Sequence, residues 1–392
     1  MAFRRLPVLM LALLFVDFID EFAAAIPPVG IPGIQADFDL SYSSAAFFVF
    51  TGPLLVAWIL EPPLFLLADR YPKKWFVCGG LFAMGGLSLA IGLSGTFVVV
   101  TGALLLSYTA SGAGVSLGQA TLMDTYPDQR ERLMTRWVFL GAAGDLAAPA
   151  LFWLLALFAL GWREAFVISG IFIVAYAAVL SRQRFEAPPR PAEDESAPGT
   201  WAALKLAFRD RTLLLWLFGS WLCTLVDEVL VAFGALHMRD NLGADLETRS
   251  LLLMCLMLGG VVGLVFLDRL LARFAPLQLL VAAGLGSSVC YVAWLTASSV
   301  TGSAVWLFAT GLFAGALYPL AKAQAYRALP DRSGMLNAMA HVFTPLDIAL
   351  PLLLGFVADR FGLVPALSLL LAGPIGLFAI GLSQLSRRST PA

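Results

Sequence analysis

Charged residues are scarce in this chain of 392 residues. Asp, Glu, Lys and Arg make up 13% of it, whereas a soluble globular domain usually carries about 25%. This shortage excludes a water-soluble enzyme and an intrinsically disordered protein. The formal net charge is only −1, so no basic field exists to attract nucleic acid. The four cysteines lie far apart in apolar runs and only two histidines are present, so the sequence predicts no disulfide framework, metal site or other cofactor.

Apolar residues are abundant instead, at 60% of the chain. A membrane-spanning helix needs about 20 mainly apolar residues. Twelve stretches meet this requirement: 7–30, 42–67, 74–94, 97–123, 133–158, 163–181, 212–237, 248–267, 276–297, 301–328, 334–358 and 362–384. The first is too long and too rich in acids to be a cleaved signal peptide. The sequence therefore predicts an all-α polytopic membrane protein with twelve transmembrane helices.

The distribution of Lys and Arg orients these spans. If the N-terminus lies in the cytoplasm, twenty Lys and Arg residues fall in inner loops and four in outer loops. Because cytoplasmic loops are enriched in positive charge, we expect both termini inside, in a plasma or bacterial inner membrane. The one long loop, 182–211, begins as a polar, Pro-rich linker and continues as a short amphipathic helix over 201–208. The expected division is 1–181, a cytoplasmic linker over 182–211, and 212–392.

The two halves repeat each other, charged residues included. Four pairs recur in order at offsets of 207, 199, 203 and 202 residues: Asp20-Glu21 with Asp227-Glu228, Asp69-Arg70 with Asp268-Arg269, Asp128 with Asp331, and Asp145 with Asp347. Four ordered matches at nearly one spacing are hard to obtain by chance. The repeat predicts two pseudo-symmetric bundles of six helices.

Two loop motifs add a family resemblance. The segment Leu67-Ala68-Asp69-Arg70-Tyr71-Pro72-Lys73-Lys74 has an Asp-Arg pair followed by a basic pair, and Trp162-Arg163-Glu164-Ala165-Phe166 precedes span six. Together with the layout, these motifs resemble the major facilitator superfamily over essentially the whole chain. The resemblance implies two related six-helix halves, with a mid-membrane site that opens alternately to each side. It also implies gating contacts for Asp69, Arg70, Asp268 and Arg269.

Acidic residues inside the spans are the main functional signal. Eight are present: Asp17, Asp20, Glu21, Glu61, Asp145, Asp227, Glu228 and Asp347. Each charge at the bilayer centre costs about 2.5–3.5 kcal/mol, so eight unpartnered charges would cost roughly 20–28 kcal/mol, more than the net stability of a typical fold. Lys322 is the one basic residue deep in a span. The surplus of acids predicts that protons or a cationic substrate bind there.

Spacing refines these expectations. Asp17 shares a helical face with Asp20 and Glu21, whereas Asp20 and Glu21 point about 100° apart. Asp145 and Asp347 each precede a proline by four residues, which predicts a bend or a cation or proton site at each. The motif Glu61-Pro62-Pro63 predicts a break in span two. The glycine-rich stretch 111–114 predicts close helix packing and not a phosphate loop.

These features favour a monomeric, proton-coupled secondary transporter that moves a small cationic or amphipathic solute outward across the lipid bilayer. One alternative is a divalent metal ion as cargo, because carboxylates suit hard cations. Another is an uptake carrier for an organic anion, with Lys322 as the anion contact; otherwise Lys322 is the internal partner of a carboxylate. An intramembrane enzyme or a receptor is disfavoured, because no nucleophile–base motif is present and the loops are short.

Overall fold

The computed structural model describes residues 8–68, 71–126, 130–185, 210–226, 228–328, 339 and 341–389. Within these ranges the chain forms helices joined by short turns and no strand. It divides into two compact units, an N-terminal unit over Met1–Arg190 and a C-terminal unit over Pro191–Ala392. The predicted amphipathic helix over 201–208 lies outside the described residues.

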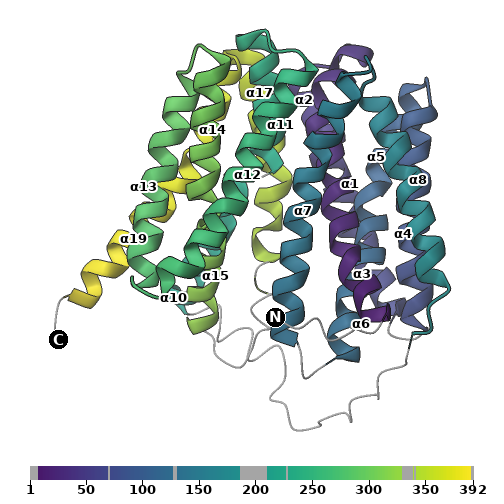
Figure 1. Ribbon diagram of the computed structural model, residues 1–392, viewed down its shortest axis with the longest axis horizontal. Coiled ribbons are helices and arrows are strands. Elements are labelled where there is room, and N and C mark those ends of the chain that lie inside the picture. Colours follow the sequence, from purple (N-terminus) through teal and green to yellow (C-terminus); the bar gives the residue numbers. More distant parts are fainter. Residues whose placement is uncertain are drawn as a thin grey trace. The chain divides into compact units, whose positions relative to one another are not determined.

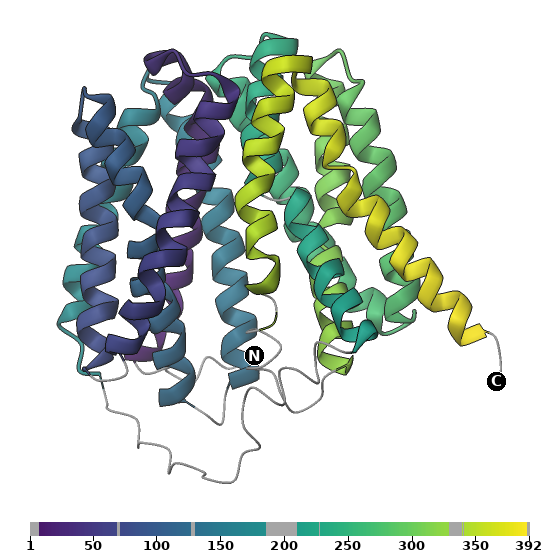
Figure 2. The ribbon, with the colours of Figure 1, turned by 180° about the vertical axis from the view of Figure 1, so that it is seen from behind.

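The N-terminal unit consists of helices that run up and down the unit, with α1 beside α7 and α4 beside α8 (Figures 1 and 2). Two of its spans contain a π-helical turn, labelled η1 and η2. Its elements are α1 (Val8–Phe38), α2 (Tyr42–Ala46), η1 (Phe47–Thr51), α3 (Gly52–Ala68), α4 (Lys73–Leu93), α5 (Phe97–Ser111), η2 (Gly112–Ser116), α6 (Leu117–Thr125), α7 (Arg130–Ala156) and α8 (Trp162–Ser181).

In the C-terminal unit, α12 lies beside α14, and α13 lies beside both α14 and α19 (Figure 1). Its elements are α10 (Arg211–Leu222), η4 (Cys223–Val226), α11 (Glu228–Leu242), α12 (Leu246–Leu271), α13 (Pro276–Leu295), α14 (Val300–Ala314), α15 (Leu317–Ala328), η5 (His341–Phe343), α17 (Thr344–Phe361), α18 (Leu363–Leu369) and α19 (Ala372–Ser389).

The predicted spans are mainly helical where the structure describes them, with turns at 315–316 and 370–371. Ten helical stretches in the described ranges are long and apolar enough to cross a membrane. The remaining two spans correspond to α1 and α17, each of which carries at least three charged residues: α1 has three acids within residues 17–21, and α17 has Asp347, Asp359 and Arg360. Both helices carry candidate site residues.

Small residues let the helices of each unit approach closely. In the N-terminal unit, a Cβ atom on Gly80 of α4 would lie 2.7 Å from Cα of Gly114, so the glycine-rich stretch of span four does pack closely, as predicted. Ser88 of α4 and Ser169 of α8 hydrogen-bond to each other at 2.8 Å. In the C-terminal unit, a Cβ atom on Gly311 of α14 would overlap the carbonyl oxygen of Leu256 on α12. Such contacts stabilise helix pairs where the solvent is as apolar as the side chains.

One sequence-based prediction about span two is wrong. Helix α3 continues from Gly52 to Ala68 without the expected break at Glu61-Pro62-Pro63. Proline holds φ near −65°, which is compatible with a helix, and in a membrane helix neighbouring groups satisfy the carbonyls that proline leaves free. Pro149 likewise lies inside α7, and Pro351 inside α17.

Candidate functional site

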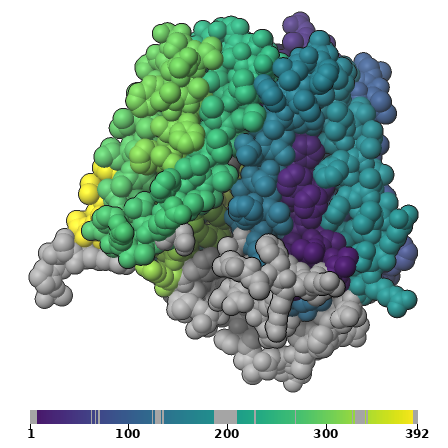
Figure 3. Space-filling view, in the orientation of Figure 1, coloured from purple at the N-terminus to yellow at the C-terminus, as the bar shows by residue number. Residues whose placement is uncertain are grey.

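Helix α1 separates an aromatic face from an acidic face. The rings of Phe15, Phe18 and Phe22 each contact Phe172 of α8 edge to face, at centroid distances of 6.1–6.4 Å. Figure 3 shows a strip of α1 at the surface of the unit, with α7 on one side and α8 on the other. Because side chains three and four residues apart share a face, this aromatic contact leaves Asp17, Asp20 and Glu21 to meet other helices.

Asp20 faces the end of α5. Its Oδ1 accepts a hydrogen bond from the Oγ of Ser111 at 2.6 Å, between residues 91 positions apart in the chain. Ser111 is the last residue of α5, and the π-helical turn η2 begins directly after it at Gly112. Turns of this kind inside helices occur frequently at functional sites. The partly buried Asp20 carboxylate therefore lies beside an irregular turn of the opposing span.

Glu61 of α3 lies against the same turn. A Cβ atom on Gly112 would come within 2.7 Å of Cδ of Glu61, so the glycine lets this carboxylate approach the turn closely. Glu61 also lies within electrostatic reach of Asp20. Three spans thus bring Asp20, Ser111 and Glu61 together around Gly112.

Asp17 and Glu21 face α7. Asp17 is buried, with 6% of its surface exposed, and its carboxylate contacts the side chain of Trp137 and the backbone of Gly141. A Cβ atom on Gly141 would lie 3.1 Å from Cγ of Glu21. Asp17 is also within electrostatic reach of Asp20. The adjacent residues Asp20 and Glu21 therefore point to different helices, which fits the 100° between them.

We refer to Asp17, Asp20 and Glu61 as the acid cluster. Among the described residues, none of these three carboxylates forms an ion pair with Lys, Arg or His. Neighbouring carboxylates titrate as a set, and uncompensated charge in a membrane interior is costly. A proton or a bound cation would neutralise the cluster. Within the described ranges, no group of three His, Cys, Asp or Glu residues has the arrangement of metal ligands.

In the C-terminal unit, the carboxylate of Asp347 lies next to aromatic side chains. Oδ1 of Asp347 on α17 accepts a hydrogen bond of 2.7 Å from the indole Nε1 of Trp221 on α10. The Trp221 ring stacks on Phe218 at a centroid distance of 5.5 Å and on Phe343 at 6.4 Å. An acceptor among aromatic rings can bind an amphipathic solute that has an apolar body and a polar end.

Lys322 is partly buried on α15 in the same unit. Its Nζ lies 6.0 Å from the centre of the Tyr318 ring one turn earlier. A cation held over an aromatic face gains electrostatic attraction. The side chain therefore has a defined place within the span and is not an exposed loop lysine.

The other candidate residues are only partly described. Asp145 lies on α7 four residues before Pro149 and is partly buried. Arg269 is exposed in the last turn of α12. Asp69, Arg70 and Asp227 lie outside the described residues, and for Glu228 and Asp268 the structure describes the helical backbone but not the side chain.

Three contributors to these sites were not predicted. Ser111, Trp221 and Trp137 each contact a predicted acid from a different helix. The signal for Ser111 was its position beside Gly112 and Gly114 in an apolar span, where a hydroxyl needs a partner. The tryptophans carry no local signal, since aromatic residues are common throughout the chain.

The sequence was compared with protein families and with known proteins. Residues 11–233, more than half of the chain, match the Major Facilitator Superfamily. The 3-(3-hydroxy-phenyl)propionate transporter of Escherichia coli (strain K12) is 28% identical over 266 residues. That match covers 65% of this chain and 64% of the transporter, so the chain spans slightly less than two thirds of this curated relative.

Solved structures share the fold over nearly the full length. A bacterial homolog of the human lysosomal transporter Spinster, in an inward-facing and unoccupied conformation, aligns with a TM-score of 0.74 at 16% identity and covers 98% of both chains. The D-xylose–proton symporter aligns with a TM-score of 0.70 at 16% identity, covering 96% of this chain and 95% of the symporter. The family match and the helical architecture agree: the chain belongs to the Major Facilitator Superfamily and is a multi-pass membrane protein.

Proposed function

We propose that this protein is a proton-coupled transporter and that the acid cluster of the N-terminal unit is its proton-binding site. One observation carries the proposal: Asp20 is held by Ser111 next to Asp17 and Glu61, and no cation of the described residues pairs with the three carboxylates. The acid cluster can therefore exchange a bound proton for a cation, or the reverse, without breaking a permanent ion pair. A proton is the smallest partner available in a membrane interior.

The cargo proposed is a small cationic or amphipathic solute. A cation and a proton would compete for the same carboxylates, so binding of one favours release of the other. Competition of this kind leads to exchange of protons for solute across the membrane. Inward proton flow would then drive the solute outward. Within the C-terminal unit by itself, the aromatic rings around Asp347 also suit an amphipathic solute.

The test is transport in proteoliposomes with an imposed pH gradient. Asp20→Asn keeps the size of the side chain but removes its charge, so gradient-driven transport should fall at least tenfold. Glu61→Gln should reduce the rate as well. Exchange of substrate for substrate without a gradient should be less affected than gradient-driven transport. The reason is that substitution of a proton site uncouples substrate movement from proton movement.

A matched control lies on the same helix. Asp37 of α1 pairs with Arg163 at 3.2 Å, and both side chains are partly exposed. Exposed pairs contribute little stability, so Asp37→Asn should transport at the wild-type rate. If Asp20→Asn retained wild-type pH-driven transport in folded protein, the proton site would have to lie elsewhere.

A second candidate cargo is an aromatic organic anion taken up together with protons. The observation that favours it is Lys322, a half-buried cation beside Tyr318, and the curated relative is named as a transporter of an aromatic acid. The variant Lys322→Gln distinguishes the two hypotheses about the cargo. Loss of organic-acid uptake with unchanged cation transport would favour the anion carrier, and the reverse pattern would eliminate it.

A further inference from the structure

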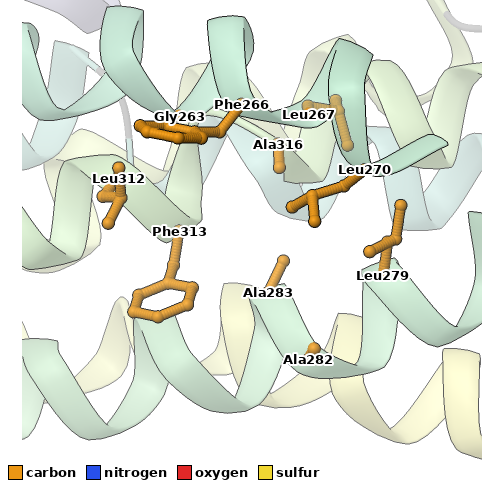
Figure 4. Close-up of a pocket in the computed structure, with 10 residues that line it drawn as sticks. All are labelled: Gly263, Phe266, Leu267, Leu270, Leu279, Ala282, Ala283, Leu312, Phe313 and Ala316. Carbon is orange, nitrogen blue, oxygen red and sulfur yellow. The ribbon is translucent and has the colours of Figure 1, made fainter. Parts of the chain in front are cut away.

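The C-terminal unit contains an apolar cavity that the acidic sites do not use. The cavity has a volume of about 340 Å³ and lies between α12, α13 and the end of α14, and every residue that lines it is apolar. In Figure 4, Leu270 of α12, Ala283 of α13 and Ala316 point into the space from different sides. Ligand pockets in proteins start at about 300 Å³, so this space is large enough for part of an elongated apolar molecule.

Small residues create the cavity. At Gly263 the backbones of α12 and α14 nearly touch, since an added Cβ atom would overlap the carbonyl oxygen of Leu312. Ala283 and Ala316, which also line the cavity, each contribute only a methyl group to its wall. The gap is therefore built by the helix packing and not by a mobile loop.

The cavity reaches the outer surface of the unit. Phe266 on its wall is 50% exposed and Leu270 is 39% exposed. Further along α13, Val289 is 57% exposed. In a polytopic membrane protein an exposed face of this composition contacts lipid, and lipid acyl chains are the apolar molecules present at highest concentration beside it.

A basic residue follows the lining residues of α12, in the turn just after that helix ends at Leu271. The residues of α12 that line the cavity follow helical spacing at 263, 266, 267 and 270. Arg273 lies three residues further on, and its backbone N donates to the carbonyl oxygen of Leu270 at 2.9 Å. Arg273 is exposed and lies in a loop that charge distribution places on the inner side. A guanidinium group binds phosphate through paired hydrogen bonds.

We propose that the cavity and Arg273 together bind one anionic phospholipid of the surrounding bilayer. Part of an acyl chain fills the space beside Ala283, and the phosphate meets the guanidinium of Arg273. Basic pockets between transmembrane helices at the cytoplasmic side bind anionic lipid head groups. The lipid is a resident ligand and not the transported solute, so this site is independent of the proposed transport mechanism.

The test is native mass spectrometry of delipidated protein titrated with phosphatidylglycerol or with phosphatidylcholine of the same acyl chains. We expect phosphatidylglycerol to bind more tightly. Arg273→Gln should weaken phosphatidylglycerol binding about fivefold, the effect of one basic residue near a membrane surface, and leave phosphatidylcholine unchanged. Arg211→Gln is the matched control, because Arg211 is also exposed on the predicted inner side but lies outside the cavity.

A second pair of variants tests the acyl-chain site. Ala283→Phe fills the cavity and should weaken binding of both lipids tenfold or more, whereas Val289→Phe on the exposed surface of α13 should not. If Ala283→Phe fails to fold, Ala283→Leu and Arg273→Gln still decide the outcome. Equal binding of both lipids to every variant would overturn the proposal. Unchanged lipid binding with lost transport in Ala283→Leu would also overturn it, because the cavity would then hold the cargo.

Discussion

The contact between Gly112 and Glu61 can be tested by adding one methyl group. A Cβ atom on Gly112 would overlap the Glu61 carboxylate, at 2.7 Å from its Cδ and 3.2 Å from its Cγ. Gly112→Ala must therefore push Glu61 away from the turn and from Asp20. Gly102→Ala is the matched control in the same span, since nothing lies within 4 Å of a Cβ atom at that position.

The magnitude follows from two opposing effects. Overpacking costs about 1–3 kcal/mol, and replacing glycine by alanine in a helix stabilises it by about 0.5–1 kcal/mol. Gly112→Ala should thus lie between neutral and destabilising by about 2.5 kcal/mol, while Gly102→Ala should be neutral or stabilising. At about 2–4 °C per kcal/mol for a unit of this size, the two variants should differ by several degrees in Tm.

Removal of the Glu61 carboxylate should abolish this difference. In a Glu61→Ala background the added methyl group meets no carboxylate, so Gly112→Ala should behave like Gly102→Ala. The coupling energy between the two substitutions should be about 1–3 kcal/mol. Transport should be slow in Gly112→Ala and should not recover in the double variant, because the displaced acid is then absent.

The chain supplies its own probe for these measurements. None of the four cysteines, all of which the structure describes, forms a disulfide, and Cys78, Cys223 and Cys290 are buried. A thiol-reactive fluorescent dye therefore reports unfolding of either unit as temperature rises. If Gly112→Ala lowers Tm equally with and without the Glu61 carboxylate, the overlap is not the cause, and the assignment of Glu61 to this turn is refuted.

Two further predictions concern the C-terminal unit. Gly311→Ala should lower Tm by several degrees, because the methyl group would overlap the carbonyl oxygen of Leu256, whereas the control Gly79→Ala in α4 of the N-terminal unit, with nothing within 4 Å, should not. Asp245→Ala should destabilise by about 1 kcal/mol, since the Asp245 carboxylate caps α12 by accepting from the backbone N of Thr248 at 2.9 Å. Hydrogen bonds from Thr248 hold the pKa of Asp245 below its usual range. The cap therefore contributes fully near neutral pH, and the Tm difference from wild type should shrink as pH falls through that lowered pKa.

Hydropathy and the internal repeat were sufficient to predict the helical spans. The spans are long apolar runs separated by short polar loops, and in lipid a helix is the only way for such a run to satisfy its backbone. Local rules were less reliable where tertiary packing intervenes. Two consecutive prolines at 62 and 63 predict a break by local chemistry, yet α3 continues to Ala68.

The acids could be identified from the sequence, but their partners could not. An ionisable residue in an apolar span is visible in the composition, because insertion of its charge is costly. Ser111 lies 91 residues from Asp20, and Trp221 lies 126 residues from Asp347. Helical periodicity fixes which residues share a face of one helix, but it carries no information about which other helix that face meets. Pairing of this kind requires the packed structure.

The repeat also predicted more symmetry than the side chains have. With the offset of 199 that relates Asp69 to Asp268, Glu61 corresponds to Gly260. With the offset of 203 that relates Asp128 to Asp331, Ser111 corresponds to Ala314 and Gly112 to Gly315. The carboxylate and the hydroxyl that surround Asp20 are therefore replaced by a hydrogen atom and a methyl group in the second half.

Packing explains why this corner of the C-terminal unit cannot perform the same chemistry. A Cβ atom on Gly315 would lie 2.7 Å from the carbonyl oxygen of Gly260, so backbone meets backbone where the N-terminal unit places the Glu61 carboxylate. A helix pair that close has no room for an acid at this position. The two halves thus share a helical scaffold, but at this position only the N-terminal unit has a carboxylate that a proton can neutralise. A proton site that depends on Glu61 and Ser111 can exist in the N-terminal unit alone, even though the Asp-Glu pair of span one recurs in span seven.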